Sequence, residues 1–470
     1  MNSRPQYVDM PVPDSRAESE ARARQLQLTK PPGSLGRLEE LACWFAARTS
    51  NPIPEISRSE IFVFAADHGV ASQGVSAFPQ SVTGQMVANF AGGGAAINVL
   101  ATLEKCPIEV VDVGVASDDE PPPSVRREKV RAGTRDLLIE AAMTDEELTA
   151  ALDVGARCAR EAIQRGAQLL IAGDMGIANT TAAACLICAF TDTMPEQVVG
   201  RGTGVDDAGL ARKREVVTAA LARARKAIGL HGSPAVDAGA ATGTPASPAA
   251  GTGKATSTAE SPSAGASKAT ATLRSPAASA SGTIGTLDMP LAGAIRAGGI
   301  SDSTAAATSK AIGTPDMSAA GAIRAGGTAH SSSAGTGKAA DIPELPSAGA
   351  RKMLAHVGGL EIAAMAGFYI EAARSGVPVL LDGYISGAAA LAAVRLEPCT
   401  VRWMLASHRS AEGGHGYALQ ALGLTPLVDL GMRLGEGSGA ALTLPIIKAA
   451  LALHRNMATF TSAGVDGKSP

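Results

Sequence analysis

Five short apolar runs constrain the fold of this chain more than any other feature of its sequence. Each run ends in a turn rich in glycine, aspartate, serine or histidine, and the runs begin at Ile61, Ile108, Ala167, Val377 and Val401. Stretches of helical pattern, 10–20 residues long, lie between them. Apolar strands that alternate with helices are typical of a parallel sheet covered on both faces. The sequence therefore predicts an α/β fold with ligands beyond the carboxyl ends of the strands.

Residues 233–350 differ from the rest of the chain. None of the 8 phenylalanines, 4 tyrosines and 2 tryptophans lies in this stretch, which is rich in Ala, Gly, Ser, Thr and Pro. It contains an imperfect duplication, at 285–299 and 313–327. Such a segment cannot bury enough apolar surface to offset its conformational entropy. We expect a low-complexity, disordered insertion.

Charge and patterning exclude several classes of protein. The net charge of −3 leaves no broad basic field for nucleic acid. The N-terminus is polar and charged, unlike a secretory signal, and no uninterrupted apolar run approaches the roughly 20 residues of a membrane span. Cys185 and Cys188 form a CxxC motif on an apolar helical pattern with no second CxxC. We therefore interpret the cysteines as core thiols of a cytoplasmic protein.

Two small-residue turns suggest an anion site. Residues 173–181 (GDMGIANTT) follow a strand and open a helix, where free amide groups and the helix dipole attract anions. Residues 200–207 (GRGTGVDD) form a second turn, and Lys213 follows in a basic helical start. Together they suit a phosphate. An ordinary helix cap followed by a turn explains the spacing equally well.

Glu436 is the candidate general base. It lies between two glycines, ahead of an alanine-rich helix, in LGMRLGEGSG (430–439). A carboxylate flanked by glycines has room for a ligand, although a solvated glutamate at a helix start has the same pattern. His68, His408 and His415 lack the spacing of metal ligands, so we expect no metal, and His68 is expected to hydrogen-bond within a turn.

Taken together, the ordered motifs resemble the nicotinate-nucleotide:dimethylbenzimidazole phosphoribosyltransferases, the CobT family. The matching segments are collinear and cover nearly all of the chain outside the insertion: 29–42 (TKPPGSLGRLEELA), 65–79 (AADHGVASQGVSAFP), 82–101 (VTGQMVANFAGGGAAINVLA), 173–184, 200–207, 357–367 (VGGLEIAAMAG), 380–391 (LLDGYISGAAAL), 407–415 (SHRSAEGGH) and 430–442.

The resemblance implies a reaction and an architecture. Nicotinate mononucleotide would give its phosphoribosyl group to 5,6-dimethylbenzimidazole, producing α-ribazole 5′-phosphate and nicotinate for the nucleotide loop of cobalamin, without a cofactor. The resemblance also implies a Rossmann-like sheet, a small helical domain built from both chain ends, and a homodimer. A non-catalytic nucleotide- or base-binding protein on the same fold, or transfer to a different base, remains an alternative.

The resemblance also assigns residues. Glu436 matches the catalytic glutamate, and Asp174 is the second carboxylate to test. The phosphoribosyl group would be held by Met175, Gly176, Ile177, Ala178, Asn179, Thr180, Gly202, Gly204, Lys213, Leu434 and Gly435. The benzimidazole pocket is expected at Ser81, Gln85 and Met86.

The chain departs from the family pattern at two site positions. The family usually has Glu at position 174 and Gly at position 178, where this chain has Asp and Ala. The extra Cβ of Ala178 is harmless if its φ is negative.

Four segments follow from this interpretation. Residues 1–60 would contribute helices to the small domain, and 61–232 with 351–430 would form the parallel α/β core. Residues 233–350 would be the insertion, and 431–470 would carry the Glu436 loop and the C-terminal helices.

Overall fold

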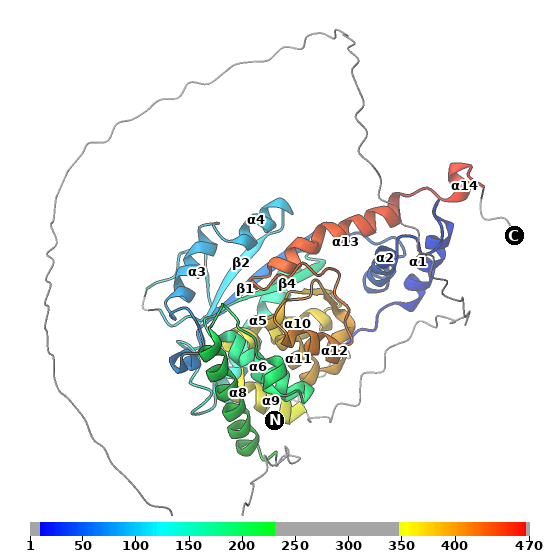
Figure 1. Cartoon of the computed structure of the whole chain (residues 1–470). Helices are drawn as coiled ribbons and strands as arrows, with labels where there is room; N and C mark the ends of the chain where they lie inside the picture. The colour runs from blue at the N-terminus through cyan, green and yellow to red at the C-terminus, as the bar shows by residue number, and fades with distance from the viewer. Residues whose placement is uncertain (1–9, 118, 231–346, 467–470) are drawn as a thin grey trace, which may run out of the picture. The chain divides into compact units, whose positions relative to one another are not determined.

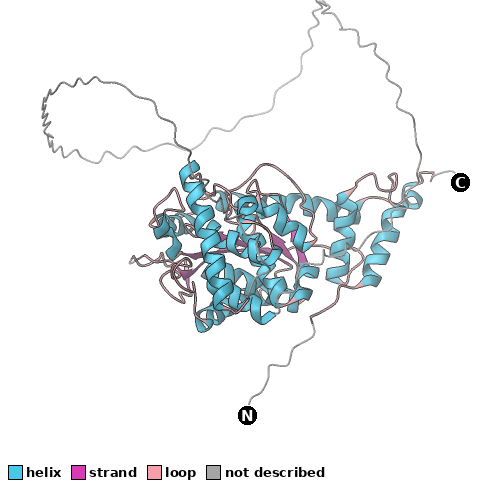
Figure 2. Ribbon diagram, turned by 60° about the horizontal axis from the view of Figure 1, so that its bottom comes forward, coloured by secondary structure: helices cyan, strands magenta, loops and turns pink. Residues whose placement is uncertain are grey.

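A six-stranded parallel sheet forms the centre of the fold (Figures 1 and 2). The structure is a computed structural model that describes residues 10–117, 119–230 and 347–466. The strand order is β3-β2-β1-β4-β5-β6. In sequence order the strands are β1 (Ser59–Ala66), β2 (Ile108–Gly114), β3 (Arg126–Arg127), β4 (Leu169–Met175), β5 (Val379–Leu381) and β6 (Met404–Ala406). The predicted α/β fold is confirmed.

Helices cover both faces of the sheet. They are α1 (Ser15–Gln27), α2 (Arg37–Thr49), α3 (Val82–Ala91), α4 (Ala96–Leu103), α5 (Asp145–Gln164), α6 (Asn179–Thr191), α7 (Pro195–Val198), α8 (Asp207–Ala227), α9 (Ser347–Val357), α10 (Leu360–Arg374), α11 (Tyr384–Leu396), α12 (Gly414–Leu422), α13 (Ser438–Asn456) and α14 (Phe460–Ala463). Two 3-10 helices are η1 (Gly69–Gln73) and η2 (Pro398–Trp403).

Alternate side chains of the strands belong to two separate apolar cores. Phe62 and Phe64 of β1 pack with α5, α6, α10 and α11, and the Phe62 ring centroid lies 5.2 Å from that of Phe368. Ile61 and Val63 point to the other face, which α2, α3, α4 and α13 cover. All eight residues of β1 are buried. Burial on both faces explains why the runs are continuously apolar rather than alternating.

The strand order reverses beside β1. From β1 the chain builds outward through β2 to β3, then returns to the other side of β1 with β4 and continues to β5 and β6. The loops after β1 and β4 therefore leave the sheet in opposite directions. The carboxyl ends of these two strands are the usual ligand position in such sheets.

Sequence analysis placed the five main strands correctly but missed or misplaced some details. It missed β3, whose two arginines carry no apolar pattern. The last strand begins at Met404, because residues 398–403 form the 3-10 helix η2. The helix expected near Arg351 begins at Ser347, and Ala350 is buried in the core. The rest of the expected insertion lies outside the described residues.

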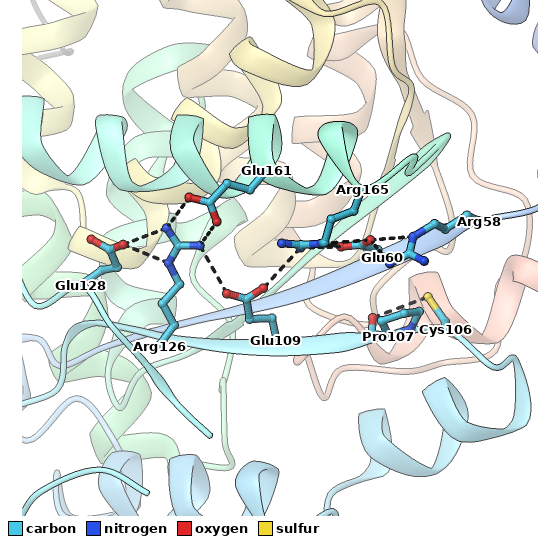
Figure 3. A network of polar contacts seen from close by, with 9 residues as sticks. All are labelled: Arg58, Glu60, Cys106, Pro107, Glu109, Arg126, Glu128, Glu161 and Arg165. Carbon is cyan, nitrogen blue, oxygen red and sulfur yellow. Dashed lines mark hydrogen bonds and ion pairs between the residues drawn. The ribbon is translucent and has the colours of Figure 1, made fainter. Parts of the chain in front are cut away.

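A charged network attaches β3 to the rest of the molecule (Figure 3). Arg126 of β3 donates to Glu161 of α5 at 2.5 and 3.0 Å and approaches Glu109 of β2 at 3.4 Å. Glu109 also contacts Arg165, which binds the buried Glu60 of β1 at 2.6 Å. A two-residue strand makes few ladder hydrogen bonds, so these ion pairs fix its position at the sheet edge.

Segments from both chain ends pack side by side. Helix α2 contacts α1 and α13, and Figure 1 shows α13 running between the sheet and α2. Arg24 of α1 donates to the carbonyl oxygen of His454 at 2.9 Å, and Leu28 forms a β-bridge with Thr459. That these helices form a domain of their own stays a prediction.

Within the described residues, one stretch, 82–103, is long and apolar enough to cross a membrane by composition. The structure divides it into α3 and α4, because α3 ends at Ala91 and the exposed Gly92, Gly93 and Gly94 follow. Each helix is far shorter than the roughly 20 residues that a span requires.

Because α5 packs closely against α10, a single methyl group added at their contact should strongly lower the stability of the protein. A Cβ on Gly155 would overlap the carbonyl oxygen of Ala364. We expect Gly155→Ala to lower the free energy of unfolding by about 2 kcal/mol or more, since overpacking outweighs the better helix propensity. Urea denaturation measures this. Gly416→Ala in α12 is the control, because its nearest neighbour is Arg409 Nη2 at 3.6 Å, and it should be neutral or stabilising by up to about 1 kcal/mol. Equal effects of the two changes would contradict the packing argument.

Candidate active site

The loop from β4 to α6 forms the floor of the candidate site. It follows a strand and opens a helix, as the sequence predicted, and it leaves the sheet at the point where the strand order reverses. Its shape is set by two glycines, since a Cβ on Gly173 would overlap the backbone of Glu436 and one on Gly176 would overlap the carbonyl oxygen of Ala66. The Ile177 amide donates to Thr83 Oγ1 of α3 at 3.1 Å. The loop therefore contacts the end of β1, helix α3 and the Glu436 segment at once.

Lys213 joins the two predicted anion-binding turns. Although it lies on α8, its side chain is buried, and Nζ donates to Thr180 Oγ1 at 2.8 Å and to the Gly200 carbonyl at 3.3 Å. A Cβ on Gly202 would lie 2.9 Å from Thr180 Oγ1 and 3.1 Å from Lys213 Nζ. The ammonium, the hydroxyl and the backbone of the turn therefore meet at one point. A cation and a helix N-terminus are the elements of a phosphate site.

Burial changes the chemistry of Lys213. Removal from water lowers its pKa to about 8, and the negative charge of Glu412 opposes this shift. The ammonium is protonated below this value and loses its charge as the pH rises above it.

The 430–436 segment closes over these turns. Arg433 donates to the Gly202 carbonyl at 2.6 Å and so attaches the segment to the second turn. Leu434 is 57% exposed, and a Cβ on Gly435 would lie 3.3 Å from Asp174 Oδ2. Gly204, with φ of 113°, has no atom within 4 Å of its Cβ position and remains open.

Glu436 is buried, and its Oε2 has no hydrogen-bond partner. Burial raises its pKa to about 7. The amide of Ile97 at the start of α4 lowers the pKa, and the charge of Asp382 raises it. The backbone at Glu436 is left-handed, with φ of 65°. A carboxylate with a free oxygen and a pKa near neutrality can accept a proton from a ligand.

Asp174 lies next to this carboxylate. It is buried, and its Oδ2 accepts from Asn179 Nδ2 at 3.0 Å, a direct contact despite the side chain being one methylene shorter than glutamate. Burial raises its pKa well above the ordinary value, and the charges of Asp382, Glu361 and Glu436 add to the effect. The Asn179 hydrogen bond opposes it.

Two of the three residues expected to bind benzimidazole line one cavity. Ser81 and Gln85 line a cavity of about 430 Å³ together with Asp67 and Asp112. Met86, one position further along α3, packs instead against the apolar core that contains Ile97. Neither Glu436 nor Lys213 is among the residues that line the cavity.

The structure corrects two expectations about individual residues. His68 does not hydrogen-bond within its turn: its Nε2 lies 2.7 Å from Glu361 Oε1, on α10. The two residues are 293 positions apart, so local sequence pattern could not predict this pair. Ala178 has φ of +74°, so the condition under which its Cβ is harmless is not met. The described residues contain no group of three or more His, Cys, Asp or Glu side chains placed to hold a metal.

Sequence reasoning also missed Asp382 and Arg433. Asp382 ends the β5 run and accepts from the Gly437 and Ala440 amides, and Arg433 lies inside the Glu436 motif. Their positions in strand-end and loop motifs were visible in the sequence, but their partners are distant in the chain.

Several known proteins are similar to this chain. The phosphoribosyltransferase family matches residues 10–264 and 265–465. A protein of Chromobacterium violaceum named nicotinate-nucleotide–dimethylbenzimidazole phosphoribosyltransferase is 45% identical, covering 97% of this chain and 98% of that protein. One of the same name from a Bradyrhizobium strain is 40% identical, covering 98% and 97%. The crystal structure of CobT from Thermus thermophilus is 36% identical with a TM-score of 0.68, covering 96% of this chain and 99% of that one.

The left-handed backbone at Ala178 predicts an unusual stabilising substitution. An L-residue in this conformation costs about 1–2 kcal/mol, whereas glycine adopts it freely. Part of the gain is lost to the greater entropy of glycine in the unfolded chain, about 0.4–1 kcal/mol. We expect Ala178→Gly to raise the free energy of unfolding by about 0.5–1 kcal/mol in urea denaturation. Ala182→Gly, inside α6, is the matched control and should lower it by about 1 kcal/mol or more. A loss of stability in both variants would show that Ala178 is not strained.

Proposed function

The chain belongs to the phosphoribosyltransferase family whose members are named nicotinate-nucleotide–dimethylbenzimidazole phosphoribosyltransferases, and we propose how its own residues carry out that transfer. The phosphoribosyl group of nicotinate mononucleotide passes to 5,6-dimethylbenzimidazole, giving α-ribazole 5′-phosphate and nicotinate for cobalamin nucleotide-loop assembly. One observation carries the assignment of roles: a buried carboxylate with a free oxygen, Glu436, lies on a segment tied by Arg433 to the Lys213 turn.

In the proposed reaction a ring nitrogen of the base attacks C1′ of the nucleotide. The new C1′–N bond forms as the bond to nicotinate breaks, and the configuration at C1′ inverts from β to α. The pyridine ring of the nucleotide is cationic, so it leaves as a neutral ring and takes the bonding electrons with it. The attacking ring becomes cationic and loses the proton on its other nitrogen. Glu436 accepts that proton.

The remaining residues bind and orient the nucleotide in this proposal. Lys213, Thr180 and the Gly202 turn hold the 5′-phosphate, because a cation and a hydroxyl lie beside the backbone of this turn. The loop residues Met175, Gly176, Ile177, Ala178 and Asn179, with Gly204, Leu434 and Gly435, surround the ribose. Asp174 is the second carboxyl to test as a proton acceptor. Burial raises its pKa and favours its protonated form, so Glu436 is the first acceptor in this proposal.

The benzimidazole is proposed to bind beside α3. Ser81 and Gln85 line a cavity on one side of α3, whereas Met86 lies on the side of Ile97, whose amide reaches Glu436. Contact with Ile97 favours the Met86 side. We also infer a homodimer in the cytoplasm, from the resemblance to the family, and light scattering in solution tests the oligomeric state.

Product analysis tests the overall reaction. The protein is incubated with nicotinate mononucleotide and a panel of bases that includes 5,6-dimethylbenzimidazole, adenine and unsubstituted benzimidazole, and the products are identified by mass. Turnover with dimethylbenzimidazole supports the proposal. Turnover with another base alone would change the substrate, and binding without turnover would indicate a non-catalytic protein.

Lys213 should act on the nucleotide rather than on the base. We expect Lys213→Ala to raise the KM for nicotinate mononucleotide at least about tenfold, because a charge-assisted contact contributes about 1.5–3 kcal/mol. The KM for the benzimidazole should change little. In the wild type, kcat/KM for the nucleotide should fall above about pH 8 as the ammonium loses its proton, and the variant should lack this alkaline limb. Equal increases in both KM values would refute the assignment.

Glu436 should be the general base. Glu436→Gln keeps the shape and removes the basicity, so we expect kcat to fall by at least about 10² while the nucleotide KM is largely kept. Because its pKa is raised to about 7, the carboxyl is protonated and inactive at lower pH. The kcat/KM for the base should therefore rise with pH to a plateau above about pH 7. Near-normal kcat in the Gln variant would make Asp174 the next candidate.

A further inference from the structure

The segment that carries Glu436 has an unusual backbone. Gly435, Glu436 and Gly437 are three consecutive residues with φ of 86°, 65° and 86°. The two glycines adopt these angles freely, but the Cβ of Glu436 disfavours this conformation. Such a residue keeps its conformation only where the surrounding structure enforces it.

Helix α13, which follows directly, begins without a cap from its own sequence. Gly437 occupies the N-cap position and has no side-chain oxygen to accept from the first amides of the helix. These amides have no partner inside the helix, and they are buried here. An acceptor from another part of the chain is therefore required.

Asp382, at the end of β5, supplies that acceptor. Its Oδ2 accepts from the Gly437 amide at 3.2 Å and its Oδ1 from the Ala440 amide at 3.0 Å. The Gly439 amide also donates a hydrogen bond to this carboxylate, which opposes the rise in the pKa of Asp382 that burial causes. A single carboxylate, 1% exposed, thus takes the place of an N-cap side chain directly behind Glu436.

The Asp382 carboxylate is itself held in place. Its own amide donates to Ser386 Oγ at 3.0 Å, and that hydroxyl pairs with the Tyr369 hydroxyl at 2.8 Å. His408 Nδ1 lies 3.9 Å from Oδ1, and a Cβ on Gly439 would overlap the His408 ring. The first turn of α13 is therefore fixed between β5 and the loop that follows β6.

We propose that Asp382 is a positioning residue that holds Glu436 in its left-handed conformation, with one carboxylate oxygen free for the base, by capping helix α13 from the end of β5. The proposal rests on the proposed function of Glu436. Asp382 acts through the helix terminus and contacts no reacting atom.

The charge of Asp382 should affect the pH dependence of activity. A residue with a purely structural role would not affect it. Asp174 faces this region from β4, His408 from the loop after β6, and the Ile97 amide from α4. Burial raises the pKa of Glu436 to about 7, and the Asp382 charge contributes to that rise. Removing the charge lowers the Glu436 pKa. The acid limb, which is the rise of kcat/KM for the base with increasing pH, therefore moves to lower pH.

The test compares two substitutions of Asp382. Asp382→Asn keeps one acceptor oxygen and removes the charge, and Asp382→Ala removes both. We expect kcat to fall about tenfold or more in the Asn variant and further, up to about 10², in the Ala variant, as for a misplaced catalytic group. The nucleotide KM should change less than threefold in both. The acid limb of kcat/KM for the base should lie at lower pH in Asp382→Asn than in the wild type.

Glu60→Gln is the matched control. Glu60 is also a buried carboxylate of the same sheet, but it lies at the amino end of β1 in the network of Figure 3. Its removal should leave the acid limb at its wild-type pH. An unshifted limb in Asp382→Asn, or an equal shift in Glu60→Gln, would overturn the proposal.

Hydrogen exchange tests the contact without a variant. The amides of Gly437 and Ala440 should be protected in the wild-type protein, and rapid exchange at both would overturn the proposal even if the variants fail to fold. Wild-type turnover of nicotinate mononucleotide is measured first. Failure at that step contradicts the proposed function, whereas wild-type turnover with an unaffected Asp382 variant contradicts only the role of Asp382.

Discussion

The candidate site depends on one close approach of two backbones, that of Gly173 at the end of β4 and that of Glu436 ahead of α13. A side chain at position 173 would overlap the carbonyl group of Glu436, so the absence of a Cβ lets the two segments meet. The contact joins two parts of the chain that are more than 250 residues apart. It brings the candidate base to the loop that precedes the proposed phosphate-binding turn. Asp174, Gly435 and the start of α6 are placed relative to Glu436 by the same contact.

Burial shifts the pKa values of the carboxyls and of the lysine near this contact in opposite directions. Loss of hydration and the charges of neighbouring carboxylates raise the pKa of Asp174 well above its usual value and that of Glu436 to about 7. Lys213 is buried near the second turn, and its pKa falls for the same reason, desolvation. A general base needs a pKa near the working pH, whereas a phosphate ligand needs to keep its proton. With the proposed roles, Glu436 is ionised above about pH 7 and Lys213 keeps its charge below about pH 8, so both groups have the required charge within one narrow pH range.

The sequence predicted the scaffold better than the connections within the site. Local patterns identified the apolar strands, the two small-residue turns and Glu436, because each depends on residues within about ten positions. The partners of these groups could not be predicted in this way. His68 pairs with Glu361, 293 positions away, and Asp382 caps α13 through Ala440, 58 positions away. Local sequence pattern carries no information over such separations. The edge strand β3 was missed because ion pairs to Glu109 and Glu161, rather than an apolar face, hold its arginines.

The two departures from the family pattern lie in the same few residues, and the structure connects them. Ala178 is strained, and the hydrogen bond between the Asp174 carboxylate and the Asn179 side chain spans it. The Ile177 amide is fixed to Thr83 on one side of Ala178, and Thr180 is fixed to Lys213 on the other. Three contacts to three different elements thus hold the residues around position 178, which is the condition under which a non-glycine residue keeps a left-handed backbone. The Asp174 carboxylate reaches Asn179 directly, so its hydrogen bond helps to hold the loop around the left-handed Ala178.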